Sequence, residues 1–204
     1  MPYHAPSDES GPRRGRAVAA PWLRGPDHSR WSWRWGVAYS PRMSDDLKAG
    51  CYCCDQQAID ALAPREDVVH TDHWRVAHAF NSTLPGWLVV VPTRHVEAFT
   101  DLSPEAADEL GGLVRRLSLA LEPVTGCVKT YLMQFSEADG FSHLHLHLVP
   151  RLPDQPDAAR GPLVFSYLSP DRSEWIPEAD RDEIALAIRA SLRSTAGEPH
   201  AAHG

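Results

Sequence analysis

The sequence predicts an α+β fold, in which an antiparallel sheet of four or five strands packs with one central helix and one C-terminal helix. Half of this sheet follows from two neighbouring segments: "WRVAHAF" (74–80) alternates as a strand does, and "GWLVVVP" (86–92) is typical of a buried strand. The turn-forming residues "NSTLPG" between them predict an antiparallel hairpin. Two further strands are predicted at "CVKTYLMQF" (127–135) and "HLHLHLV" (143–149).

Two amphipathic segments predict the helices. Ser103 is expected to cap the central helix and Pro104 to lie in its first turn. The central helix, predicted to end near Glu122, then carries one apolar face, formed by Leu110, Leu113, Val114, Leu117 and Leu121. The C-terminal helix, "EADRDEIALAIRASLRS", is expected to bury a face formed by Ile184, Ala187, Ile188 and Leu192.

Composition divides the chain into three parts. Residues 1–42 hold seven arginines against three acidic residues, four of the seven tryptophans and no sustained periodicity, which predicts a disordered N-terminal extension. A basic, tryptophan-bearing arm that docks on a partner is the alternative. We expect the folded domain at residues 43–195 and a flexible tail at residues 196–204.

Charge and hydropathy exclude several classes of function. The formal net charge is −7, and residues 43–204 alone carry −11, which argues against a nucleic-acid-binding protein because such proteins present a basic face. A small phosphorylated ligand needs only a few local donors and stays possible. No apolar run approaches the ~20 residues that cross a bilayer, and no secretory signal is recognisable. We therefore expect a cytoplasmic protein without a membrane partner.

Three histidines alternate with three leucines in "HLHLHL" (143–148). On a strand, His143, His145 and His147 would share one face at steps of ~6.6 Å, and the leucines would share the other. Three interpretations are open. The histidines could form an ordinary polar face, although Ser, Thr or Lys would serve equally well there. A His-x-His pair could chelate a metal, or the row could be catalytic, because a neutral imidazole is a competent nucleophile near pH 7.

The segment "HLHLHLVPR" resembles the signature of the histidine triad (HIT) family, in which histidines alternate with apolar residues. Upstream, "NSTLPGWLVVVPTRHVEAFTDLSPEAADEL" is similar to the family's hairpin, its Pro-x-x-His turn and the start of its central helix. The resemblance covers roughly residues 51–151 and implies the HIT-like variant of the α+β fold.

The resemblance implies a role for each histidine. His145 is expected to attack the α-phosphorus of a nucleotide and form a nucleotidyl-histidine, which water then cleaves. His147 is expected to bind the α-phosphate oxygens. His143 is expected to help fix the tautomer and position of the nucleophile. Such a site needs donors aimed at the phosphoryl oxygens.

A structural zinc site is the second expectation. Cys51 and Cys54 form C-x-x-C, a spacing that suits two thiolates on one zinc ion. Some family members complete the site with two histidines at the positions of His95 and His143, so the resemblance implies a closed Cys2His2 set that stabilises the fold. Free thiols beside an incidental histidine are the alternative, and Cys53 could replace a neighbour.

The substrate-binding residues are less sharply predicted. Asn81 is a candidate for a ribose hydroxyl, although relatives commonly place that group two residues earlier, at Ala79 in this chain. The Gly-Gln or Gly-Ser element of many relatives is missing before the triad. Gln134 and Ser142 are therefore the candidate donors near the phosphate, and Ser136 could also supply a donor.

The resemblance implies a nucleotide hydrolase that acts on a dinucleoside polyphosphate or a nucleoside phosphoramidate, with diadenosine polyphosphates or adenylate phosphoramidates as the expected substrates. It also implies a homodimer. Two alternatives are a nucleotidyltransferase or phosphorylase on the same scaffold, which would share the first half-reaction, and a zinc-stabilised nucleotide-binding module without turnover.

Overall fold

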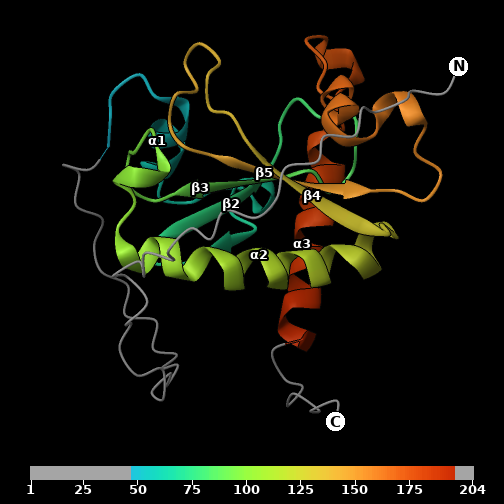
Figure 1. Ribbon diagram of the computed structural model, residues 1–204, viewed down its shortest axis with the longest axis horizontal. Coiled ribbons are helices and arrows are strands. Elements are labelled where there is room, and N and C mark those ends of the chain that lie inside the picture. The colour runs from blue at the N-terminus through green and yellow to red at the C-terminus, as the bar shows by residue number, and fades with distance from the viewer. Residues whose placement is uncertain (1–46, 196–204) are drawn as a thin grey trace, which may run out of the picture. The chain divides into compact units, whose positions relative to one another are not determined.

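The computed structural model describes residues 47–195 and is shown in Figure 1. The disordered extension predicted at residues 1–42, the first residues of the predicted domain and the flexible tail predicted at residues 196–204 lie outside the described residues. Within the described part of the chain, no helix is both long and apolar enough to span a membrane.

Five strands form one antiparallel sheet in the order β1-β2-β3-β5-β4, which confirms the predicted α+β fold. Their bounds are β1 Val69–His70, β2 Trp74–His78, β3 Leu88–Pro92, β4 Lys129–Gln134 and β5 Leu146–Arg151. The two-residue strand β1 is too short to leave a pattern in the sequence, whereas the other four match predicted segments.

The predicted hairpin joins β2 to β3, with Val76 paired to Val90 at its centre. Gly86 makes its turn possible, because its φ of 80° favours glycine. A Cβ at this position would also lie 2.6 Å from Cγ2 of Thr125. The turn therefore packs directly on the end of a helix, and it sets the place of Trp87, the next residue.

The central helix α2, Pro104–Thr125, begins as predicted. The hydroxyl of Ser103 accepts a hydrogen bond of 3.2 Å from the amide of Ala106. The helix continues through Pro123 and ends at Gly126, in the left-handed conformation, so it is longer than the sequence predicted. The face predicted to be apolar is the packed one: its buried members are Leu113, Leu117 and Leu121, and Leu110 and Val114 pack beside them.

The C-terminal helix α3, Glu178–Thr195, crosses α2 (Figure 1). The predicted buried face was wrong in one residue: Ala187 is exposed and Ala185 is buried. The packed stripe runs through the buried Ala185 and Ile188 and the partly buried Leu192, because α3 packs both on α2 and on the short 3-10 helix Pro64–Glu66. These helices and one face of the sheet enclose the main core, which leaves the opposite face of the sheet for the histidines.

Strand β5 begins at Leu146, three residues later than predicted. The amide of Leu144 donates to the main-chain oxygen of Val96, and the amide of His145 donates to the hydroxyl of Ser136, so neither amide takes part in the ladder. The predicted alternation still holds across this boundary, since the three leucines of the run are all buried. His143 and His145 thus precede the strand, and His147 lies in it.

Candidate functional site

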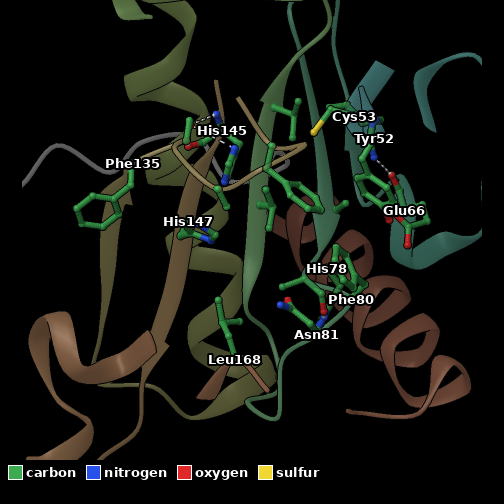
Figure 2. Close-up of a pocket in the computed structure, with 18 of the residues that line it drawn as sticks. Tyr52, Cys53, Glu66, His78, Phe80, Asn81, Phe135, His145, His147 and Leu168 are labelled. Carbon is green, nitrogen blue, oxygen red and sulfur yellow. Dashed lines mark hydrogen bonds between the residues drawn. The ribbon is translucent and has the colours of Figure 1, made fainter. Parts of the chain in front are cut away.

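Two histidines of the triad line a cavity of about 360 Å³ on the exposed side of the sheet (Figure 2). The rings of His145 and His147 meet edge to face, with their centroids 5.0 Å apart. The size of this cavity is in the range of small-molecule sites. Its walls are mostly apolar and include the aromatic side chains Tyr52, Phe80, Phe135, Phe141 and Phe165.

Hydrogen bonds select the tautomers of these two rings. Nδ1 of His145 donates to the main-chain oxygen of His143 at 2.8 Å, so the neutral ring carries its lone pair on Nε2. His147 has the opposite arrangement, because its Nδ1 accepts a 3.0 Å hydrogen bond from Nε1 of Trp87 and its proton therefore lies on Nε2. One ring thus offers a nucleophilic nitrogen and the other offers a donor.

Burial keeps His147 neutral. It lowers the pKa of His147 to about 4, with a further contribution from the nearby His145 ring. At neutral pH this side chain therefore acts through its N–H group and not through a positive charge.

Ser136 holds the backbone of His145 in place. Its hydroxyl accepts a hydrogen bond from the amide of His145 at 3.0 Å and lies 3.3 Å from the carbonyl oxygen of the same residue, to which it donates. Gln134 Nε2 also donates to this hydroxyl, at 3.1 Å. Ser136 has a φ of 53°, which is unfavourable for a residue with a side chain. The three hydrogen bonds compensate for this conformation and fix the position of His145.

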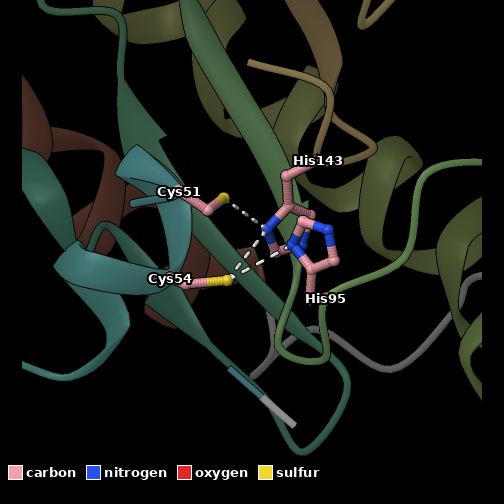
Figure 3. Close-up of side chains that lie close together, drawn as sticks. All are labelled: Cys51, Cys54, His95 and His143. Atoms are coloured by element: carbon pink, nitrogen blue, oxygen red, sulfur yellow. Dashed lines mark hydrogen bonds between the residues drawn. The ribbon is translucent and has the colours of Figure 1, made fainter. Parts of the chain in front are cut away.

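Four potential metal ligands converge beside the triad: Cys51, Cys54, His95 and His143 (Figure 3). Their ligand atoms all lie within 4.8 Å of one another. Cys51 precedes the short helix α1, Tyr52–Gln57, and Cys54 lies in its first turn, so this helix brings both thiols to the imidazoles. All four residues predicted for a zinc site are therefore brought together.

The separations fit a tetrahedral ion. Sγ of Cys54 lies 3.4 Å from Nδ1 of His95 and 3.5 Å from Nδ1 of His143, and Sγ of Cys51 lies 3.5 Å from the same His143 nitrogen. A tetrahedral zinc with Zn–S of ~2.3 Å and Zn–N of ~2.0–2.1 Å would separate such atoms by roughly 3.6 Å. The donor set, two thiols and two imidazoles, is one that structural zinc sites use.

The second nitrogen of each of these histidines is hydrogen-bonded outside the cluster. Nε2 of His143 donates to the main-chain oxygen of Arg94 at 3.1 Å, and Nε2 of His95 lies 3.3 Å from a carboxylate oxygen of Glu97. Such contacts orient metal-binding imidazoles so that the other nitrogen faces the ion. Glu97 also accepts from Lys48 at 2.8 Å, and these hydrogen bonds lower its pKa to about 2.

The three predicted substrate-binding residues lie in different surroundings. Asn81 lines the cavity, near the end of β2. Gln134 contacts Ser136, and Ser142 donates from its hydroxyl to Glu97 at 3.1 Å, next to the metal-ligand cluster. Neither Gln134 nor Ser142 is among the described residues that line the cavity.

Sequence reasoning missed the roles of Trp87 and Glu97. Trp87 is fully buried, and no sequence signal shows that its indole reaches His147. Glu97 follows His95 by two residues, a weak signal that a carboxylate lies near that imidazole.

Comparisons with known proteins agree with this geometry. Residues 62–154 match the family model of the HIT domain. The chain is similar to the structure of a HIT-like protein of Bartonella henselae involved in cell-cycle regulation, with 21% identity and a TM-score of 0.53 over 68% of this chain and 93% of that one. For a zinc-bound histidine triad family protein of Mycobacterium smegmatis the identity is 20% and the TM-score 0.52, over 76% and 98% of the two chains.

A hypothetical histidine triad nucleotide-binding protein of Sulfolobus tokodaii is 16% identical, with a TM-score of 0.51 over 71% of this chain and 91% of that one. At these identities the structural likeness concerns the fold alone. The family match also includes the histidine motif, since the matched residues contain all five strands and the three histidines. Residues 62–154 of this chain therefore form a HIT domain.

Proposed function

We propose that this protein is a nucleotide hydrolase that cleaves at the α-phosphate of a dinucleoside polyphosphate or a nucleoside phosphoramidate. The observation that carries the proposal is the 2.8 Å hydrogen bond from Nδ1 of His145 to the main-chain oxygen of His143. It leaves the lone pair on Nε2, in a ring that lines a cavity of nucleotide size.

The reaction has two steps. Nε2 of His145 attacks the α-phosphorus, the new P–N bond forms, and the bond to the leaving group breaks. Water then attacks the same phosphorus, the P–N bond breaks, and the nucleoside monophosphate is released with the imidazole restored. His147 donates its Nε2–H to an α-phosphate oxygen, where negative charge develops.

Ligand contacts beyond the triad follow from the cavity lining. Asn81 is our candidate for a ribose contact, because it is a polar side chain in a mostly apolar wall. Gln134 and Ser142 would not contact the ligand directly. Gln134 would act through Ser136, and Ser142 would act through Glu97.

A substrate panel tests the proposal. Wild-type protein and His145→Asn are incubated with nucleoside phosphoramidates and dinucleoside polyphosphates, and the products are identified by mass. We expect nucleoside monophosphate from the wild type, a nucleotidyl adduct after acid quench, and a loss of at least about 10³-fold in the variant. Near-normal turnover by His145→Asn would refute the assignment.

The same panel separates the alternatives. With inorganic phosphate added, a phosphorylase would release a nucleoside diphosphate in place of the monophosphate. A binding module would retain nucleotide without forming an adduct.

We also propose that Cys51, Cys54, His95 and His143 hold a structural zinc ion. Burial raises the pKa of the Cys54 thiol to about 11, so a thiolate there needs a nearby cation. A zinc ion would supply that charge and tie α1 to the sheet. Zinc content measured on the purified full chain, with and without chelation, tests this assignment.

A homodimer is the third part of the proposal. β4 is an edge strand, and large apolar side chains on it or next to it are about half exposed: Val128, Leu132 and Phe135. An exposed apolar edge of this kind suits pairing with a second copy of the chain.

A further inference from the structure

Charged side chains lie at the end of the cavity that is far from the histidines. Glu66 and Arg75 both line it. Figure 2 shows Glu66 beside Tyr52 at one end, with His145 and His147 toward the other. The strand that carries Arg75, β2, is two strands away from β5, which is roughly 10 Å at the usual strand spacing. That distance is comparable with the reach from the phosphorus of a nucleotide to the far edge of its base.

Arg75 has an unused donor. Its side chain is 1% exposed, and its Nη1 donates to the main-chain oxygen of Glu66 at 2.6 Å. Its Nε is buried and has no hydrogen-bond partner. A buried guanidinium nitrogen without an acceptor is unfavourable, so this edge of Arg75 is suited to an acceptor brought in by a ligand.

Glu66 offers the complementary group. It ends the 3-10 helix Pro64–Glu66 and is half-buried. Among residues 47–195 no hydrogen bond to its carboxylate is found, whereas its main-chain oxygen is taken by Arg75. This end of the cavity thus presents one donor group and one acceptor group.

Aromatic rings form the walls between these groups and the histidines. The Tyr52 and Phe80 centroids lie 5.3 Å apart, and the ring of Phe141 stacks at 28° to that of Phe80. Flat rings of this kind bind a nucleobase by stacking and accept any base. Selection among bases must therefore come from polar side chains, and Glu66 and Arg75 are the charged ones at this end of the cavity.

We infer that the cavity prefers guanine, a base that presents two adjacent acceptors and two adjacent donors. Its O6 and N7 suit the guanidinium of Arg75, and its N1–H and N2 amino group suit the carboxylate of Glu66. Adenine has an amino group in place of O6 and therefore meets Arg75 with a donor. This inference rests on the proposed nucleotide function and replaces the adenylate substrates that the sequence resemblance implied.

Calorimetric titration of the full chain with GMP, IMP and AMP tests the preference. IMP keeps O6 and N1–H but lacks the N2 amino group, and AMP lacks all three. We expect IMP to bind about tenfold more weakly than GMP, and AMP at least about 100-fold more weakly, because each unmatched polar group costs about one such factor.

Two variants assign the contacts. Glu66→Gln should abolish the GMP-over-IMP ratio, since the amide no longer accepts two hydrogen bonds, and should lower the IMP-over-AMP ratio, since the amide can donate to N1 of adenine. Arg75→Met should lower the IMP-over-AMP ratio and leave the GMP-over-IMP ratio unchanged. Its folding is checked by near-UV circular dichroism, and Glu66→Gln, at a half-buried position, tests the inference independently. Arg193→Met and Glu183→Gln are matched controls at exposed positions on α3 and should leave both ratios unchanged.

The outcomes separate base preference from function. AMP binding as tight as GMP binding, or ratios unchanged in Glu66→Gln, would overturn the guanine assignment even if nucleotides are hydrolysed. Guanine-selective binding without turnover would leave the assignment standing and remove the hydrolase. Absence of binding by all three nucleotides would remove the guanine assignment and leave the hydrolase to be decided by the substrate panel.

Discussion

The indole of Trp87 donates a 3.0 Å hydrogen bond to Nδ1 of His147, and this contact decides which nitrogen of His147 carries the proton. Trp87 is fully buried and lies directly before β3, after the turn at Gly86. The backbone turn of the hairpin therefore sets the protonation pattern of a histidine on another strand.

Replacing this donor should affect turnover more than stability. Trp87→Phe keeps an aromatic ring in the core but frees Nδ1 of His147, so part of the population would carry its proton there and present a lone pair to the phosphate. We expect kcat to fall roughly tenfold, the value of one hydrogen bond in the transition state. Steady-state kinetics and the ¹⁵N shifts of the His147 ring measure the two effects.

Trp74→Phe is the matched control. The indole of Trp74 donates to the main-chain oxygen of Ala106 at 2.9 Å, on the helix-covered face of the sheet. Both variants should lose about 1 kcal/mol of unfolding free energy. Equal kcat values in the two variants would contradict the role given to Trp87.

Glu97 should tune metal binding without touching the metal. In Glu97→Gln the negative charge next to Nε2 of His95 is removed, so that imidazole becomes a poorer ligand. We expect zinc affinity, measured by competition with a chelator, to weaken about 10–100-fold. Glu183→Gln, at an exposed position on α3, serves as the control. Indistinguishable zinc affinities in the two variants would mean that Glu97 is only a surface charge.

The exposed edge of the sheet gives a test of oligomeric state. Leu132 on β4 is 49% exposed. Leu132→Arg should convert a dimer into a monomer in sedimentation velocity, because a buried arginine without a partner is costly at an interface. Leu186→Arg changes a leucine of the same exposure on α3 and should leave the mass unchanged. A dimer that persists in Leu132→Arg would place the interface elsewhere.

A buried histidine predicts how stability depends on pH. His78 donates from Nδ1 to the main-chain oxygen of Ala79 and accepts from the amide of Gly86 at Nε2, and burial lowers its pKa to about 4. The unfolded chain takes up this proton near pH 6.5 and the folded chain does not. The folded state therefore loses stability as the pH falls from 6.5 toward 4, by on the order of 3 kcal/mol from this group.

Urea unfolding at several pH values measures this loss. The difference between wild type and His78→Gln isolates the contribution of His78 from that of the other histidines. The unfolding free energy of the variant should fall less steeply below pH 6.5. Parallel curves for the two proteins would show that His78 does not titrate on unfolding.

Periodicity predicted the large elements because their faces differ in polarity. The central helix carries Leu113, Leu117 and Leu121 on one side, so the spacing of these leucines was enough to infer which face packs. The helix α1 and the strand β1 were missed because six and two residues are too few to show a period. Ala187 was assigned to the core because an alanine at the edge of an apolar stripe carries little information about its burial.

Residue types at the site were predictable, whereas their hydrogen-bond partners were not. The spacing of Cys51 and Cys54, together with the family resemblance, was enough to select the four residues of the cluster. The contact of Ser136 with His145 depends on a left-handed backbone at a serine, which no sequence rule favours. The hydrogen bond from Arg75 to the main-chain oxygen of Glu66 depends on how a 3-10 helix meets a strand.

His143 belongs to both halves of the site. Its imidazole faces the two thiols, and its main-chain oxygen receives the proton-bearing nitrogen of His145. A chain that fails to assemble the cysteine-histidine cluster would therefore also misalign His145, the ring that we propose attacks the phosphorus. Because correct folding and the proposed catalysis both depend on His143, we expect a misfolded copy to be inactive toward nucleotides and not to be an active enzyme of lower specificity.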